Sequence, residues 1–242
     1  EGTNIGPTVG VNIPINANTI LALGVGHTIR GQFTRSGDFG NPTSVLNPGD
    51  VTTATAQIGY RSGPLSLMAQ FGYSWETMTT LDGVAFFRAG DRIQVAVAAG
   101  YAWTEMWSSR VTVSYSHFNK NVAHNPPPFG AIGIEPFNSN NDVVNVVFDT
   151  TYRNGAYAIG PSIGYMYRAR NGWDPTAELF VPAKNLWTFG GVGRYQVTNS
   201  ASLTARVQYL TGRTSEILYF ANPTPELTTR GWQFSLGGTV QL

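Results

Sequence analysis

The chain of 242 residues contains no cysteine, and charged residues make up only 12% of it. Without cysteine there are no disulfides and no zinc or iron–sulfur sites held by thiolates. The charged fraction is about half of the roughly 25% that is typical of soluble domains. The formal net charge is only +1, so bulk electrostatics gives no reason to expect a nucleic-acid partner. No run of about 20 apolar residues occurs, which excludes membrane-spanning helices.

The chain is nevertheless not a polar, disordered sequence. Aromatic residues make up 12% of it, the reverse of the composition of disordered segments. The mean hydropathy of −0.11 shows that the missing charge is not replaced by hydrophobic bulk. Glu1 opens directly onto strand-like sequence, as expected of a processed or trimmed chain.

The dominant pattern is a two-residue alternation, which is typical of strands, and no helical periodicity competes with it. In the last segment, Trp232, Phe234 and Leu236 alternate with Gln233, Ser235 and Gly237. The same alternation predicts about eleven strands. They lie near residues 3–14, 19–33, 51–61, 65–78, 91–103, 109–120, 143–153, 156–169, 186–197, 202–216 and 230–242.

These strands have an unusual polarity. Soluble sandwiches carry charged residues on their outer face, whereas the non-apolar positions here are mostly Gly, Ala, Ser, Thr, Gln and Asn. The strands are also longer than the usual five to six residues and fit the roughly 9–11 residues of a tilted membrane-spanning strand. Strands in lipid must close into a barrel, because their backbone groups have no water to bind. We therefore expect residues 1–242 to form one all-β domain, a transmembrane antiparallel up-and-down β-barrel.

The connections alternate between short and long, as in barrels with short periplasmic turns and long extracellular loops. With that orientation, aromatic residues of the apolar positions fall into two groups, one at each end of the strands, as membrane-interface belts do. The expected outer belt is Phe33, Trp75, Tyr167, Trp187 and Trp232, and the expected inner belt is Tyr60, Trp103, Tyr152, Tyr157 and Tyr195. A soluble barrel or sandwich with aromatic core residues is the alternative.

The C-terminal residues resemble a known signal. Ser235, Gly237, Val240 and Leu242 fill the four places of the C-terminal β-signal of bacterial outer-membrane barrels, although many members of that class end in Phe. The resemblance implies a porin-like, integral protein of the bacterial outer membrane, in contact with membrane lipid and lipopolysaccharide. It also implies recognition by the barrel-assembly machinery through these four residues.

The strand count raises a question of parity, because bacterial single-chain barrels usually have an even number of strands. A barrel of about twelve strands is the preferred interpretation. The twelfth strand would be hidden, with residues 81–88 and 176–183 as the best material, or would lie upstream of Glu1. An odd-stranded barrel, or one closed by another chain, is the remaining alternative.

The sequence offers little chemistry for catalysis or metal binding. His27, His117 and His124 lie far apart in the strand order, so no shared metal is expected. Ser116 and His117 are adjacent in a strand and point to opposite faces, so they cannot form a dyad. No enzyme activity and no cofactor are expected.

The charges on the polar positions are the most informative feature, because charged rings in a pore select ions of opposite sign. The expected pore-lining residues are Arg30, Arg61, Glu76, Arg92, Arg110, Asp149, Arg153, Arg168, Arg194 and Arg206. Arginines outnumber acids among them. We expect five of them to group towards the periplasmic end: Arg61, Arg110, Arg153, Arg194 and Arg206. Small residues on the same positions would widen the bore: Gly24, Gly26, Gly59, Gly72, Gly100, Gly160, Gly164, Gly190 and Gly237.

Two functions are compatible with these features. One is a channel for passive diffusion of small polar, anionic solutes. The other is a structural or interaction barrel, either plugged or serving as a sheath for a secreted polymer or an electron-carrier partner. The triple proline at 126–128 stiffens a long loop that could fold into the pore.

Overall fold

The computed structural model describes residues 3–35, 43–125, 130–215, 217–219, 222–224 and 226–240. All of its named elements are strands. No described segment forms a helix long and apolar enough to cross a membrane. The triple proline at 126–128 lies outside the described residues, and so does Leu242.

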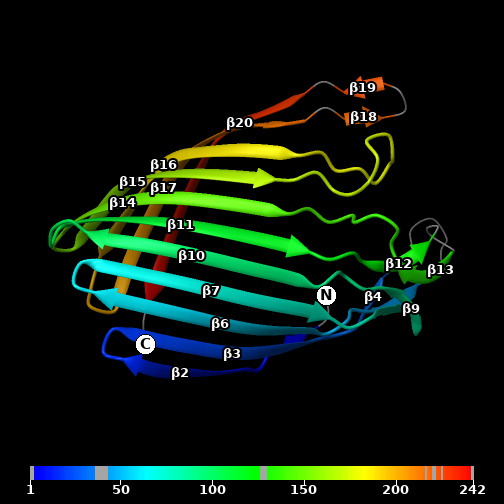
Figure 1. Cartoon of the computed structure of the whole chain (residues 1–242), viewed down its shortest axis with the longest axis horizontal. Coiled ribbons are helices and arrows are strands. Elements are labelled where there is room, and N and C mark those ends of the chain that lie inside the picture. The colour runs from blue at the N-terminus through cyan, green and yellow to red at the C-terminus, as the bar shows by residue number, and fades with distance from the viewer. Residues whose placement is uncertain are drawn as a thin grey trace.

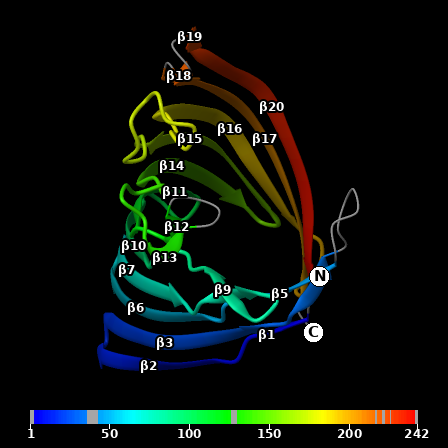
Figure 2. The same ribbon diagram turned by 90° about the vertical axis from the view of Figure 1, so that its right-hand side faces the viewer.

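One antiparallel up-and-down sheet contains the long strands, each hydrogen-bonded to the next in chain order (Figure 1). It comprises β1 (Asn4–Ile5), β2 (Thr8–Asn16), β3 (Thr19–Arg30), β6 (Val51–Ser62), β7 (Leu65–Glu76), β10 (Arg92–Ala102), β11 (Trp107–Phe118), β14 (Val143–Asn154), β15 (Tyr157–Arg168), β16 (Lys184–Gln196), β17 (Ala201–Thr214) and β20 (Leu227–Val240). Seen from the end with the long loops, the sheet curls around a central space (Figure 2).

The sheet has twelve named strands, and both β1 and β2 pair with the same neighbour, β3. These two strands are successive pieces of one crossing, interrupted at Gly6 and Pro7, so the twelve strands occupy eleven positions. The segments named above as hidden strand material are not part of this sheet. Residues 81–88 contribute to a separate loop hairpin, and residues 176–183 form no strand.

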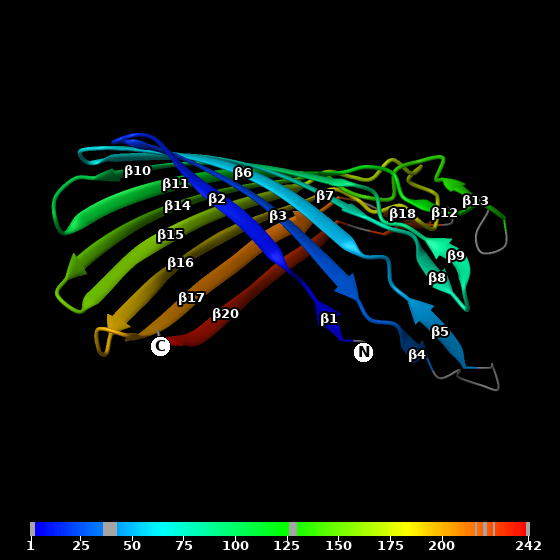
Figure 3. The same ribbon diagram turned by 90° about the horizontal axis from the view of Figure 1, so that it is seen from below.

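The two border strands, β2 and β20, run in the same direction. Strand β2 ends at the tight turn that leads into β3, and β20 ends on that same side, which is called the turn end below (Figure 3). The opposite end, with the long connections, is called the loop end. Because an antiparallel barrel closes only between strands of opposite direction, the odd number of positions accounts for this parallel arrangement of the borders.

The register confirms the alternation across the whole sheet. At its centre, Val113 of β11 lies opposite Val97 and Val146, whereas Ser114 lies opposite Ala96 and Asn145. The first set defines the apolar face and the second the polar face. A one-residue slip between any two strands would exchange the faces, so the pattern fixes the register strongly.

The apolar side chains are not packed into a core. Ala98 is the only buried hydrophobic residue among those described, whereas Phe234 and Leu236 on the apolar face are 73% and 80% exposed. A soluble protein would not leave a continuous apolar band of this size in water. This band excludes the soluble sandwich and identifies the apolar face as the lipid-facing side of the sheet.

Aromatic side chains border the apolar band at both ends. At the loop end, Tyr165 packs against Trp187 and Tyr209 against Trp232 in tilted pairs, with ring centroids 4.7 and 5.1 Å apart. At the turn end, Trp107 and Tyr152 lie 4.9 Å apart, and Tyr157 and Tyr195 lie 4.8 Å apart. Each is a cross-strand pair of directly opposed residues. The two belts are confirmed, except that Phe33 belongs to a loop strand.

The long connections contain strands of their own, which the alternation did not predict. A four-stranded loop sheet contains β4 (Phe33–Arg35), β5 (Ser44–Asn47), β8 (Thr79–Leu81) and β9 (Val84–Phe87). Two further hairpins are β12 (Val122–Asn125) with β13 (Ala131–Ile134) and β18 (Ile217–Tyr219) with β19 (Asn222–Thr224). A bridge between Arg88 and Val122 joins the loop sheet to the first of these hairpins. In the view from the loop end, β5, β9, β12 and β13 are drawn within the outline of the curled sheet (Figure 2).

The glycines of the polar face do not all serve to widen the bore. A Cβ atom on Gly160 would collide with the Thr150 carbonyl, where the β14–β15 ladder is interrupted beside Pro161. Proline has no N–H to donate, so this break is built into the sequence. Gly59, in contrast, has open space at the Cβ position.

We therefore expect Gly160→Ala to lower the free energy of unfolding by about 1–3 kcal/mol, the usual effect of overpacking. Gly59→Ala is the matched control and should leave stability nearly unchanged. Urea unfolding in detergent, followed by intrinsic fluorescence, measures both. Equal stability of the two variants would contradict the close approach at Gly160.

Candidate functional site

The register places all ten expected pore-lining residues on the polar face. They come from nine strands of the sheet: β3, β6, β7, β10, β11, β14, β15, β16 and β17. Their environments nevertheless differ between the two ends of the strands.

Three arginines near the loop end are engaged in structural contacts. Arg30 forms an ion pair with Glu76, and its Nε donates to the Gly49 carbonyl at 2.5 Å. Arg92 lies over the Phe118 ring, 4.9 Å from its centroid. Arg168 donates to the Pro182 carbonyl at 3.2 Å. These contacts hold the strand ends and the loops together.

Removal of the carboxylate in the Arg30–Glu76 pair should therefore affect stability. Both side chains are largely shielded, with 27% and 17% of their surface exposed, so Glu76→Gln leaves a part-buried guanidinium without its counter-charge. We expect a loss of about 1–3 kcal/mol in the free energy of unfolding. The double variant Arg30→Gln/Glu76→Gln should recover part of the loss in urea titrations. A single variant as stable as the wild type would show that the pair contributes nothing.

Near the turn end, a second group of charges meets in one cavity of about 380 Å³. Its charged residues are Arg110 on β11, Asp149 and Arg153 on β14, Arg194 on β16 and Arg206 on β17, called the arginine pocket below. Ser108, Ser109, Thr150, Thr151, Ala158, Gly160, Pro161 and Val192 complete the lining. The expected grouping of arginines is thus present for four of the five, whereas Arg61 lies on β6 and does not line this cavity.

The small residues of β15 make room for these arginines. Ala158 is the register partner of both Arg153 and Arg194, so it lies between them. Because neighbouring strands are about 4.8 Å apart, the two arginine backbones are about 10 Å apart. Gly160 and Pro161, at the interrupted part of the ladder, also line the cavity. The alternation alone could not reveal this break, although the Gly-Pro pair is its signal in the sequence.

The arginine pocket carries an excess of positive charge. In the part of the chain that the structure describes, the ion pairs involve His27, Arg30, His117 and Arg213 as the basic partners. None of the four pocket arginines therefore has a described carboxylate within ion-pair distance, including Arg110, whose register partner is Asp149. Four guanidinium groups face one carboxylate, and guanidinium groups stay protonated at any working pH.

The histidines form separate contacts. His27 Nδ1 lies 2.8 Å from Thr52 Oγ1, His117 Nδ1 lies 2.7 Å from Asp142 Oδ1, and His124 Nδ1 lies 2.6 Å from the Gly130 carbonyl. Among the residues that can be described, no three His, Asp or Glu side chains gather as metal ligands would. The His117–Asp142 pair was not anticipated from the sequence, because Asp142 lies in a long connection. Ser116 points to the opposite face, as its register with Gln94 shows.

The residues of the C-terminal signal lie at the end of the last strand. Ser235 and Gly237 are on the polar face of β20, opposite Arg206 and Thr204, and Val240 is its last residue. Recognition by an assembly machinery stays a prediction.

Comparisons with known proteins give similarities of fold. No model of a protein family and no curated protein matches the chain. Among solved structures, it is similar to OmpT, an outer membrane protein of Vibrio cholerae, with 12% identity, a TM-score of 0.49 and coverage of 99% of this chain and 89% of that chain. The trimer form of OmpT gives 13% identity, a TM-score of 0.47 and coverage of 99% and 91%. A NanC porin gives 8% identity, a TM-score of 0.39 and coverage of 99% of both chains.

No functional residue is carried over at these identities. The up-and-down strand order, the exposed apolar band and the two aromatic belts show by themselves what kind of protein this is. These features are those of a membrane-spanning, antiparallel up-and-down β-sheet with one lipid-facing side, the architecture of outer-membrane β-barrels. The short connections lie at the turn end and the long ones at the loop end, as expected of the periplasmic and outer sides of such a barrel.

Proposed function

We propose that the protein is a channel for passive diffusion of small polar solutes, with a preference for anions. The observation that carries the proposal is the arginine pocket, in which Arg110, Arg153, Arg194 and Arg206 share one cavity with Asp149. A barrel with eleven strand positions lies between those filled by side chains and those with a wide aqueous channel. Its conductance therefore depends on the side chains of the polar face.

Two features of the polar face support this proposal. The four pocket arginines are all exposed rather than buried against the sheet, so their charges are available to a passing ion. In addition, several positions on the polar face of β6 and β7 carry small or neutral residues, such as Thr55, Gln70 and Gly72. Four of the eight arginines of the polar face are thus gathered on β11, β14, β16 and β17, whereas Arg30, Arg61, Arg92 and Arg168 lie on other strands.

Single-channel recording in planar bilayers tests the proposal. Purified protein should give discrete open levels, and a KCl gradient should give a reversal potential on the chloride-selective side. A protein that stays closed under all voltages, or one that selects potassium, would contradict it.

One observation favours the alternative of a plugged or interaction barrel. Loop strands β5, β9, β12 and β13 lie within the outline of the sheet as seen from the outer side (Figure 2). If these loops close the mouth, deletion of residues 84–87 should raise the conductance. Steady closure even after this deletion would favour the sheath or plug.

A further inference from the structure

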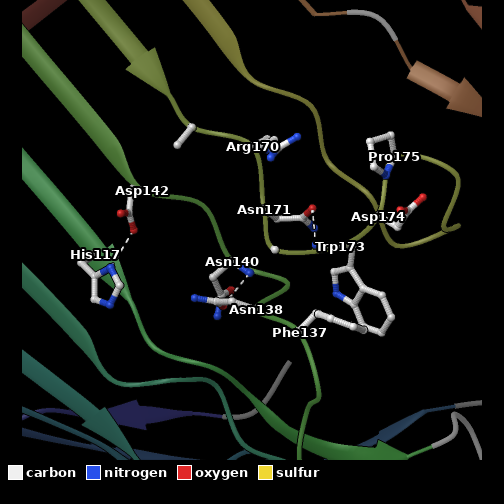
Figure 4. Close-up of a pocket in the computed structure, with 12 residues that line it drawn as sticks. His117, Phe137, Asn138, Asn140, Asp142, Arg170, Asn171, Trp173, Asp174 and Pro175 are labelled. Carbon is white, nitrogen blue, oxygen red and sulfur yellow. Dashed lines mark hydrogen bonds and ion pairs between the residues drawn. The ribbon is translucent and has the colours of Figure 1, made fainter.

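A second cavity, of about 540 Å³, lies between two of the long connections at the loop end (Figure 4). Its lining includes His117, Phe137, Asp142, Arg170 and Trp173, which together are called the rim pocket. None of these residues belongs to the arginine pocket or to the expected pore lining.

The alternation shows which side of the sheet the rim pocket continues. His117 follows Tyr115 on the apolar face of β11, Ala169 follows Tyr167 beyond β15, and Asp142 precedes Val144 before β14. Each of the three lies two positions from a lipid-facing residue, so the alternation places all three on the same side of the sheet. The floor of the rim pocket is therefore the outward extension of the apolar face, directly beyond the aromatic belt, at the level of the outer-leaflet headgroups.

The walls of the rim pocket are held by a dense hydrogen-bond network between the two connections. Asn171 is only 4% exposed, and its side chain donates to the Leu179 carbonyl at 2.7 Å and accepts from Val181 N at 3.1 Å. The Trp173 indole N–H donates to Ser139 Oγ at 2.8 Å, which fixes the ring. Such fixed walls lower the entropy cost of binding a ligand.

The surface of the rim pocket combines an aromatic platform with charges of both signs. The Phe137 and Trp173 rings lie 5.2 Å apart, and Phe137 is 51% exposed. Arg170 and Asp174 are exposed beside them, and the hydrogen bonds from the Thr176 hydroxyl and N–H hold the pKa of Asp174 below its usual value. Asn138 and Asn140 also line the cavity, and their side-chain amides donate to the Phe118 and Asn119 carbonyls.

This combination suits a saccharide better than it suits an acyl chain or a bare anion. A sugar ring offers a C–H face to an aromatic ring and hydroxyl groups that bind amides, carboxylates and guanidinium groups. An acyl chain would leave the polar groups unpaired, and a bare phosphate would face the carboxylates of Asp142 and Asp174. We propose that the rim pocket binds the saccharide headgroup of a glycolipid in the outer leaflet.

Calorimetric titration of the full chain in detergent tests this proposal, with lipopolysaccharide and phosphatidylglycerol as separate probes. Phe137→Ala/Arg170→Gln removes one face of the platform and one cation, and neither side chain has a described hydrogen bond to lose. We expect about a tenfold loss of affinity for lipopolysaccharide and no change for phosphatidylglycerol. Phe86→Ala, which removes an exposed aromatic ring from another loop, is the matched control and should bind like the wild type.

Competition separates the saccharide from the lipid that carries it. Oligosaccharide released from lipopolysaccharide should displace the intact glycolipid from the wild type, though more weakly. Unchanged affinity of the double variant, an equal loss for phosphatidylglycerol, or no displacement by the oligosaccharide would each overturn the proposal. Heat-modifiability on gels monitors folding, and Arg170→Gln alone carries the same test if the double variant does not fold.

Discussion

The replacement of Arg110, Arg194 and Arg206 together by glutamine should move the reversal potential in a KCl gradient from the chloride-selective side toward zero. Three of the four cations of the arginine pocket are then removed, while Asp149 remains. In water, a unit positive charge about 10 Å away lowers the electrostatic energy of an anion by about 0.4 kcal/mol. Three such charges lower it by about 1.2 kcal/mol, which corresponds to a roughly sevenfold higher local anion concentration before screening. Bilayer recordings at several salt concentrations measure the shift.

The control for this prediction removes the same number of charges elsewhere. Arg213 and Arg230 lie on the apolar side of β17 and β20, and Arg170 lies in a loop, so their joint replacement by glutamine should leave the reversal potential unchanged. The wild-type selectivity should also be constant from about pH 5 to pH 9, because arginine does not titrate there. An unaltered reversal potential in the pocket variant would defeat the assignment of selectivity to these residues.

The second large effect concerns the lipid-facing side. Val113→Lys places a charge at the middle of β11 on the apolar face, where lysine costs about 2–4 kcal/mol near the bilayer midplane. Thr112→Lys, one residue away, places the same charge on the polar face. We expect the first variant to lose that stability and the second to stay close to the wild type.

Urea unfolding in lipid vesicles, monitored by tryptophan fluorescence, compares the two variants directly. Because they differ by one position in a strand, their propensity and distance from the ends are closely matched. A comparable loss in both, or a greater loss in Thr112→Lys, would contradict the assignment of the faces.

Much of the architecture follows from local alternation. Every second residue of a strand points to the same face. The alternation in residues 65–78 therefore assigns Phe71 to the lipid-facing side and Gln70 to the polar side without knowledge of the neighbouring strands. The ends of the long strands could also be predicted from the sequence, because the turns near 63–64 and 155–156 contain Gly63 and Gly155, both with positive φ. The small loop strands were missed because segments of three or four residues are too short to show a period.

The sequence by itself determined the two faces and the strand order, and it predicts the sides of the membrane on which the connections lie, since each depends on the spacing of residues along the chain. Only the tertiary structure decided which charges meet. Arg30 and Glu76 are 46 positions apart and form a pair, whereas Arg110 and Asp149 are opposed in the ladder and do not. Arg61 and Arg153 both lie near turns, yet only Arg153 joins the arginine pocket. Partnership between charges depends on the curvature of the sheet and on the space left by neighbours such as Ala158, and neither is encoded in the alternation.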